Sequence, residues 1–369
     1  MVILGINISH DASICLFKDG DIVFYLEEEK LQKIKHFEVF HLNDKYTLQS
    51  ILKLKKYVDY IDYVIFTTVS RDNKKTDVSI SEKIINDILS LGIKIKNIEL
   101  CLHHHHLHHA YNGFYNSRFE KAGVVVVDGA GSYIQKNNEV NKLYKEVESC
   151  YTFSYPNQAT VNYKHYVSFD IWNSHKVERY IDDEKDHLQI LSNYCGSGVV
   201  FNNYCNLFKL YSGPSNINWA EAGKLMGLSS YGKPNKKITW VEYYNDYPMY
   251  NMTYFKDLQN NYIKNNFNFQ EMADIARKVQ DETKEHTVRL IQKTIEKSQS
   301  NNIVLSGGYF LNCVNNYAYI KEFPDINFYV DPICYDGGTA IGACFYVWHH
   351  ILGNPNALKK FNNLYLGPE

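Results

Sequence analysis

The chain has 369 residues, of which 39 are lysine or arginine and 41 are aspartate or glutamate, giving a formal net charge of -2 at pH 7. This length allows two domains or one large duplicated domain, and the near-zero charge gives no general attraction to nucleic acid or to an anionic membrane. The eight cysteines form no C-x-x-C pair, which argues against a disulfide scaffold or a zinc knuckle and favours the cytoplasm. No apolar run approaches the roughly 20 residues that span a bilayer, which argues against a membrane partner.

The N-terminal region begins with a pattern of strands and turns. Short apolar runs predict three strands, at Val2–Ile6, Ser13–Phe17 and Ile22–Leu26. A tight turn at Lys18–Asp21 joins the last two as a hairpin. Further elements follow in chain order: helical spacing over 46–58, a strand over Tyr63–Thr67, and a helix over Ser81–Leu91 that Gly92 ends.

Six histidines lie within Cys101–Tyr111, an internal run that a terminal expression tag does not explain. Two pairs, His104 with His108 and His105 with His109, are spaced by four residues. On a helix this spacing stacks both rings on one face, as a metal needs from two nitrogen ligands. A solvated polar face is the structural alternative, and the residues alone do not choose between the two registers. The pattern favours a metal or phosphate site.

A second set of elements repeats the pattern of the first. Gly123–Val127 predicts a buried strand that ends in Asp128-Gly-Ala-Gly131, and Tyr144–Phe153 predicts a further strand. The repetition indicates a duplicated α/β core with a cleft between its halves. Residues 155–270 are interpreted as an irregular insertion. The remaining elements are a long helix over Phe269–Gln299, a strand over Ile303–Leu305 and a helix over Tyr309–Tyr319.

Two glycine-rich turns carry chemistry suited to anions. Leu305-Ser-Gly-Gly308 follows a strand and opens a helix, and Asp336-Gly-Gly-Thr-Ala-Ile-Gly342 repeats that pattern with a carboxylate at its start. Backbone N–H groups at such turns can approach a phosphate, although each turn alone is weak evidence. Asp128 ends an apolar strand, where a carboxylate is costly unless paired or bound to a cation. Two histidines with Asp128 and Asp336 would suit iron, manganese or zinc better than magnesium.

His10 and Asp11 follow the first strand, where a histidine can act as a general base towards a hydroxyl. A histidine that only caps the turn is an equally good interpretation. Lys35 and His36 follow an acidic run, Glu27–Glu29, and as a bare charge pattern indicate a solvated helix face.

In chain order these motifs resemble those of the O-carbamoyltransferases of the nodulation-protein and antibiotic-tailoring type. They are more distantly similar to the catalytic subunit that makes threonylcarbamoyl-adenosine in tRNA. The matching stretches are Gly5–Ser13, Glu28–His36, His105–Ala110 with Phe114, Ser117 and Phe119, Asp128–Gly131, Gly223–Leu228, Leu305–Gly308 with Asn312, and Asp336–Ala343. Each is weak alone, but seven in the family's order, spanning nearly the whole chain, are strong.

The resemblance implies an α/β, actin-like ATPase fold of two duplicated ribonuclease-H-like halves around a nucleotide cleft. Residues 1–120, with the histidine cluster, would form the first half, and 121–369 the second, with the insertion at about 155–270. Relatives continue into a YrdC-like domain that activates carbamoyl phosphate, which this sequence lacks. We therefore expect a separate YrdC-like subunit, or else a different carbamoyl donor.

The resemblance also implies which residues act. His105, His109, Asp128 and Asp336 would hold the metal, Fe²⁺ first and Mn²⁺ or another divalent ion as alternatives. Family members make carbamoyl-adenylate from carbamoyl phosphate and ATP, then pass the carbamoyl group to a hydroxyl. The residues implied for ATP are Lys224, Gly227, Ser306, Gly307, Gly308, Asn312, Gly337 and Gly338. His10, next to Asp11, would deprotonate the acceptor, with Lys35 or His36 stabilising charge, while His103, His104, His106 and His108 have no implied role.

The acceptor could be a small molecule or a hydroxymethylated pyrimidine such as 5-hydroxymethylcytosine, as a nucleotide or in DNA. One alternative is a threonylcarbamoyl transferase acting on tRNA, against which the stretches Gly223–Leu228 and Asp128–Gly131 argue. A second is a non-catalytic nucleotide-binding module, against which the retained histidines and aspartates argue. Lys30 and Lys33 stand where the family usually has arginines, and lysine cannot make a bidentate contact to an anion.

Overall fold

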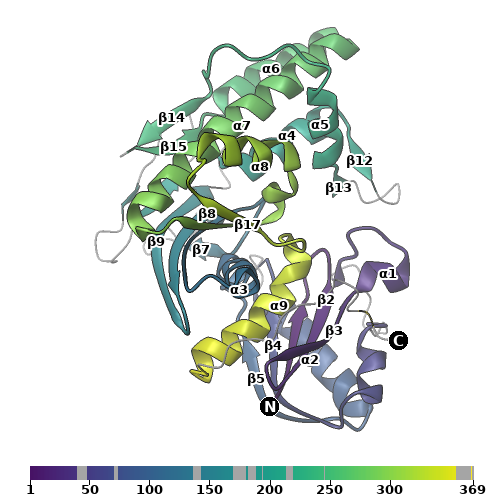
Figure 1. Ribbon diagram of the computed structural model, residues 1–369. Coiled ribbons are helices and arrows are strands. Elements are labelled where there is room, and N and C mark those ends of the chain that lie inside the picture. The colour runs from purple at the N-terminus through teal and green to yellow at the C-terminus, as the bar shows by residue number, and fades with distance from the viewer. Residues whose placement is uncertain are drawn as a thin grey trace.

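Two β-sheets with the same strand order form the framework of the protein (Figure 1). The computed structural model describes residues 1–39, 48–69, 74–135, 143–168, 180–181, 188–192, 194–212, 219–244, 246–354 and 367. Among the helices so described, none is both long enough and apolar enough to cross a membrane.

The first sheet has the order β3-β2-β1-β4-β5. Its strands are β1 (Val2–Asn7), β2 (Ser13–Lys18), β3 (Asp21–Glu27), β4 (Tyr60–Thr67) and β5 (Lys94–Leu100). The first three are antiparallel neighbours, whereas β4 and β5 run parallel to β1. The predicted hairpin is confirmed, with Asp19 and Gly20 both at positive φ, as a two-residue turn between twisted strands requires. Three helical segments accompany this sheet: α1 (Glu28–Gln32), the 3-10 helix Ile51–Lys56 and α2 (Lys74–Ser90).

The second sheet repeats this order as β9-β8-β6-β16-β17. Its core strands are β6 (Lys121–Val127), β8 (Leu143–Ser154), β9 (Gln158–Ser168), β16 (Asn302–Ser306) and β17 (Asn327–Val330). β8 is antiparallel to both β6 and β9, and β16 and β17 are parallel to β6. Three short strands extend this sheet: β7 (Tyr133–Gln135), β10 (Tyr180–Ile181) and β11 (Leu188–Ser192). The repeated topology confirms the actin-like fold of two ribonuclease-H-like units.

Two helices lie side by side between the sheets, and each follows one sheet in sequence but packs on the other (Figure 1). α3 (His105–Ser117) follows the first sheet but packs on β6 and β16, while α9 (Thr339–Phe345) follows the second sheet but packs on β1 and β2. The two helices approach closely, since a Cβ added to Gly342 would lie 1.9 Å from the carbonyl oxygen of His108. Together they fill one apolar core that contains side chains from both sheets.

Residues 155–270 contain more regular structure than the sequence predicts. β9, the third strand of the second sheet, lies within them, so the expectation of a wholly irregular insertion is wrong for 158–168. The buried residue His165 is polar and pairs with Glu148 of β8, whereas Lys164, on the opposite face and only partly buried, pairs with Glu146. His165 therefore interrupts the apolar alternation by which strands are recognised.

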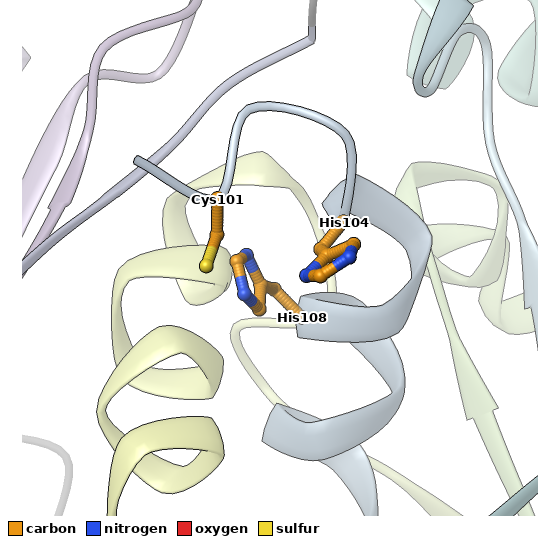
Figure 2. Close-up of side chains that lie close together, drawn as sticks. All are labelled: Cys101, His104 and His108. Atoms are coloured by element: carbon orange, nitrogen blue, oxygen red, sulfur yellow. The ribbon is translucent and has the colours of Figure 1, made fainter. Parts of the chain in front are cut away.

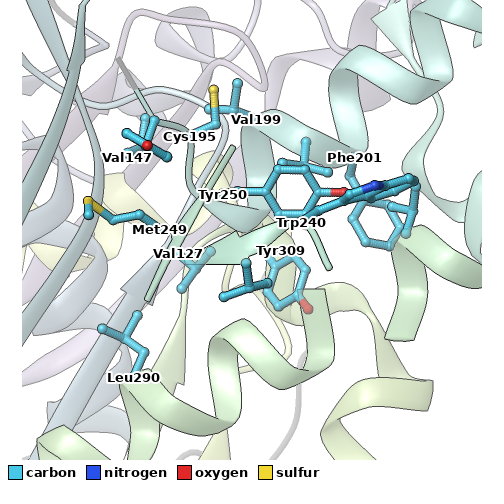
Figure 3. Close-up of a cluster of buried hydrophobic side chains, with 14 of the residues drawn as sticks. Val127, Val147, Cys195, Val199, Phe201, Trp240, Met249, Tyr250, Leu290 and Tyr309 are labelled. Carbon is cyan, nitrogen blue, oxygen red and sulfur yellow. The ribbon is translucent and has the colours of Figure 1, made fainter. Parts of the chain in front are cut away.

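The described elements of this interval that follow β11 pack over the outer face of the second sheet. These elements are α4 (Ser197–Leu207), β12 (Tyr211–Ser212), β13 (Trp219–Ala220), α5 (Ala222–Ser229), β14 (Val241–Tyr244), β15 (Tyr247–Tyr250) and α6 (Thr253–Asn265). Figure 3 shows the core that they form, in which Trp240 and Tyr250 pack near Phe201 and Tyr309. The long helix α7 (Phe269–Ser298), predicted from the sequence, contributes Leu290 to this core.

The final elements connect the second sheet back to the first. The predicted helix over Tyr309–Tyr319 is divided into a 3-10 helix, Gly308–Leu311, and α8 (Cys313–Glu322). The division occurs because the Asn312 side chain caps α8 by accepting from the Asn315 N–H. A 3-10 turn (Asp336–Gly338) precedes α9, and a π-helical segment (Tyr346–Ile351) follows it. Positions 46 and 47 of the helix predicted over 46–58 lie outside the described residues.

Candidate active site

Four side chains from three parts of the chain meet between the two sheets. α3 carries His105 and His109, Asp128 directly follows β6, and Asp336 opens the 3-10 turn before α9. Their potential ligand atoms all lie within 4.8 Å of one another, and all four side chains are buried. We call these residues the central cluster. The fold thus brings together the set that the resemblance implied, while its occupation by a metal stays a prediction.

The distances inside the central cluster suit a cation better than direct hydrogen bonds. His105 Nε2 lies 3.2 Å from His109 Nε2 and 3.5 Å from an oxygen of Asp128 and of Asp336. His109 Nε2 lies 3.5 Å from Asp336 and 4.0 Å from Asp128. Direct N–H···O bonds measure about 2.7–3.2 Å, so most of these pairs are too far apart. Two unprotonated nitrogens and two carboxylates would converge on one point, and a divalent cation would relieve their repulsion.

The electrostatics of the central cluster also favour positive charge. Burial alone would lower the pKa of His105, but Asp336 and Asp128 outweigh it and raise this pKa to about 9. Burial would raise the pKa of Asp336, whereas His10 and His105 hold it well below its ordinary value. The Nδ1 atoms of His105 and His109 are buried without a hydrogen-bond partner among the described residues. The residues present therefore fit a borderline metal such as Fe²⁺, Mn²⁺ or Zn²⁺.

His10 and Asp11 from the β1–β2 loop extend this cluster towards the first sheet. His10 Nε2 lies 3.1 Å from Asp336, and His10 Nδ1 lies 2.9 Å from Asp11. Against the effect of burial, Asp336 and Asp11 raise the pKa of His10 to about 10. Asp11 also pairs with His36 Nδ1 at 2.8 Å. Three of the predicted catalytic residues are therefore contiguous with the central cluster.

Asn7 is a positioning residue that the sequence analysis did not identify. Its side-chain amide donates to the carbonyl oxygens of His10, Asp11 and Asp336, at 3.1, 3.2 and 3.2 Å. It therefore ties the first loop to the turn that carries Asp336, across more than 300 residues of sequence. Its place at the end of β1 was the available signal, because polar side chains at strand ends often face a site.

The glycine turn after β16 supports the central cluster directly. The Gly308 N–H donates to Asp128 at 3.1 Å, and the Ser306 hydroxyl donates to the His109 carbonyl at 2.9 Å. Gly307 has a φ of 95°, and a Cβ there would lie 2.2 Å from the Val127 carbonyl oxygen. These three residues thus have structural partners around the central cluster, and nucleotide binding by them stays a prediction.

The other predicted nucleotide residues are distributed over several elements. Asn312 exchanges side-chain hydrogen bonds with Gln280, at 2.9 and 3.0 Å. The Lys224 ammonium donates to the Tyr211 carbonyl at 2.7 Å, and a Cβ at Gly227 would meet open space. A Cβ at Gly337 would instead lie 2.6 Å from the Tyr25 hydroxyl, and one at Gly338 2.0 Å from the Ile333 carbonyl.

Lys35, the fourth predicted catalytic residue, forms an ion pair with Glu221, the residue before α5. This contact joins a loop of the first half to a helix of the second. Lys30 pairs with Glu29 and Glu27 on the same segment. Among the described residues, neither lysine forms a hydrogen bond or an ion pair with the central cluster.

The surplus histidines have separate environments. His106 is buried and bonds to the Ser149 hydroxyl at 2.9 Å, whereas His103 is exposed. His104 and His108, the second register of the histidine run, lie beside Cys101. Both registers therefore face potential ligands, which explains why spacing alone could not choose between them.

Residues 73–345 match the family model of the carbamoyltransferase N-terminus. An uncharacterized protein of Synechocystis sp., sll1178, is 26% identical over 416 residues, covering 99% of this chain and 60% of its own length. Nodulation protein NolNO of Sinorhizobium fredii is 22% identical over 395 residues, covering 98% of this chain and 49% of its own length. The chain thus spans between half and three fifths of the curated relatives it matches.

Among solved structures, full-length HypF in its phosphate- and nucleotide-bound form matches with a TM-score of 0.58 and 14% identity, covering 99% of this chain and 47% of that one. HypF of T. kodakarensis matches with a TM-score of 0.57 and 11% identity, covering 97% and 49%. At these identities the likeness establishes the shared fold alone.

Proposed function

This chain belongs to the carbamoyltransferase family, and we propose that it transfers a carbamoyl group to an acceptor hydroxyl. The donor would be carbamoyl-adenylate, made from carbamoyl phosphate and ATP. The observation that carries the proposal is the convergence of His105, His109, Asp128 and Asp336 within 4.8 Å in a family member. A cluster so poorly satisfied by its own contacts costs free energy unless a ligand completes it.

These four residues would hold a divalent metal, for which we propose Fe²⁺. The metal would act as a Lewis acid on the phosphate and the mixed anhydride of the donor. Asp128 is kept in position by the Gly308 N–H, and Asp336 by the hydrogen bond from Asn7 to its backbone. Both carboxylates are thus oriented before a ligand arrives.

His10 is our candidate for receiving the proton of the acceptor hydroxyl. With Asp336 at 3.1 Å and Asp11 at 2.9 Å, the ring is held as a cation and cannot accept a proton. A cation bound by Asp336 would offset the charge of this carboxylate, which would lower the pKa of His10 and let Nε2 act as a base. Asp11, fixed by His36, would keep Nδ1 protonated and so orient the ring.

The test is reconstitution of transfer with the purified, untagged chain. Carbamoyl phosphate, ATP and Fe²⁺ are supplied with and without a YrdC-like protein, because the relatives are longer than this chain. Mass spectrometry then detects the replacement of a hydrogen by a carbamoyl group on candidate acceptors, including sugars and 5-hydroxymethylcytosine as nucleotide and in DNA. We expect product with the second protein present.

The control compares His105→Ala with His103→Ala, an exposed position on the same segment. We expect the first to lose product and the second to retain it. Equal activity of both variants would reject the catalytic metal site. Threonylcarbamoyl-adenosine in tRNA, after addition of threonine and bicarbonate, would instead support the tRNA-modifying alternative.

A further inference from the structure

A second group of metal-ligating side chains lies at the junction of β5 and α3. Cys101 follows the last residue of β5, and His104 is the residue before α3. The His104 N–H donates to the Cys101 carbonyl at 3.3 Å, and the His108 N–H donates to the His104 carbonyl at 2.8 Å. A turn followed by one helical step therefore brings together three residues that we call the thiol cluster. Figure 2 shows the Cys101 thiol and the rings of His104 and His108 gathered at this junction.

The geometry of the thiol cluster is close to that of a coordination site. The Cys101 sulfur and one ring nitrogen from each histidine all lie within 4.8 Å of one another. Ligands bound tetrahedrally at bond lengths of about 2.0–2.3 Å are separated by roughly 3–4 Å, so small side-chain rotations would suffice. The spacing C-x-x-H-x-x-x-H also has the short intervals that zinc sites use.

Three of the four ring nitrogens in the thiol cluster are buried without a hydrogen-bond partner in the part of the chain that the structure describes. His108 is fully buried, and neither of its ring nitrogens has a hydrogen bond among the described residues. His104 Nδ1 is likewise buried without a hydrogen bond. The Tyr346 ring packs against both imidazoles, with centroids at 5.5 and 5.6 Å, and excludes other partners on that side. Buried polar atoms in proteins are normally satisfied, so these nitrogens indicate a ligand that binds there.

We propose that Cys101, His104 and His108 bind a second divalent metal of the zinc type, separate from the metal of the central cluster. One thiolate and two imidazoles form a softer donor set than two imidazoles and two carboxylates, so the two sites would prefer different ions. The three protein ligands leave a fourth position for water.

The second metal would have a structural consequence for the first site. His104 and His108 each precede a residue of the central cluster, His105 and His109, on the same two turns of α3. A metal bound to Cys101 would anchor the first turn of α3 to the end of β5. It would thereby restrict rotation of the helix that aims His105 and His109. The binding itself does not depend on the proposed reaction.

The test is a Co²⁺ titration of the full chain after the native metals have been removed with a chelator. A thiolate bound to Co²⁺ gives a near-ultraviolet charge-transfer band, which the central cluster cannot produce because it contains no sulfur. We expect two equivalents of Co²⁺ to bind, one of them with this band, and Zn²⁺ to displace that equivalent.

The variants assign the band to its residues. Cys101→Ala and His104→Ala should each lose the band and one equivalent, and neither position is fully buried. His105→Ala should keep the band, and so should Cys313→Ser, since Cys313 is an exposed thiol far from the cluster in sequence. Circular dichroism checks that each variant is folded. No band in the unmodified chain, or a band that survives in folded Cys101→Ala, would overturn the proposal.

Discussion

Two buried clusters of histidine and carboxylate in this protein differ in how their charges are satisfied. In the second half, the Glu148 cluster is held by two short hydrogen bonds to the Glu148 carboxylate, from His286 at 2.7 Å and from the Ser197 N–H at 3.1 Å, and His165 lies further away at 3.4 Å. In the central cluster the corresponding nitrogen–oxygen distances are 3.5–4.0 Å. A cluster whose members hydrogen-bond to one another stabilises the fold. A cluster whose nitrogen and oxygen atoms are held apart around one point is suited to binding a cation.

The largest expected effect is a loss of stability of the fold when the Glu148 cluster is mutated. Glu148→Ala should lower the free energy of unfolding by about 3–5 kcal/mol, because His286 and His165 lose a buried partner. Urea denaturation measures this loss. Glu296→Ala, a half-exposed position on α7, is the matched control and should change stability by less than about 1 kcal/mol. If the two variants unfold alike, the Glu148 cluster has no stabilising role.

The Glu148 cluster should also make the stability of the fold depend on pH. Although burial raises the pKa of Glu148, His286 and His165 lower it from 4.5 to about 2. A depressed carboxyl pKa adds stability above pH 4.5, and this contribution is lost as the pH falls towards 2. The stability advantage over Glu148→Gln should therefore shrink by about 3 kcal/mol across this range, as urea denaturation at several pH values would reveal. A constant advantage would contradict the cause given for the shift.

Mutation of the central cluster should reduce metal binding and activity rather than the stability of the fold. Asp336→Asn should weaken Fe²⁺ binding and carbamoyl transfer by about 100-fold, equivalent to about 2.7 kcal/mol, because a charged ligand becomes neutral. Metal analysis and product formation measure the two effects. Asp331→Asn, a buried aspartate that is outside the cluster, should retain the metal. If Asp336→Asn instead lowered the stability of the fold and left the affinity for Fe²⁺ unchanged, the two clusters would not differ in this way.

The smallest effect is expected where a charge pair lies at the surface. Lys35 is about half exposed, so Lys35→Ala should change the free energy of unfolding by only about 0.2–1 kcal/mol through its pair with Glu221. The difference should disappear at high salt, because an exposed pair is screened. Urea denaturation at two salt concentrations checks this. A salt-independent change would indicate a packing role for Lys35.

The apolar parts of the fold were predictable from the sequence, and the polar parts were not. β6 follows its hydrophobic pattern closely, since Gly123–Val127 is wholly apolar. β9 was missed because His165 interrupts its apolar face, and the partner of His165, Glu148, lies on another strand. Periodicity records whether a residue is apolar, and it does not record whether a polar residue will find a partner.

The candidate site was predictable only with the help of the resemblance. The histidine spacing left two registers open, and in the structure each register faces a different set of potential ligands. Asp128 and Asp336 are separated by more than 200 residues, and they come together only because β6 and β17, the strands that precede them, join the same sheet on either side of β16. Asn7 and Cys101 were not selected because neither shows its role until the chain is folded.

The exchange of α3 and α9 between the sheets has a consequence for folding during synthesis. The inner face of the first sheet, which includes Ile3 and Phe17, is covered by α9, whose residues are 339–345. A ribosome must therefore synthesise the chain past residue 345 before that face can be buried. Such high contact order predicts slow folding and a long-lived, aggregation-prone nascent chain. Limited proteolysis of stalled nascent chains should accordingly show the first sheet becoming protected only after α9 has emerged.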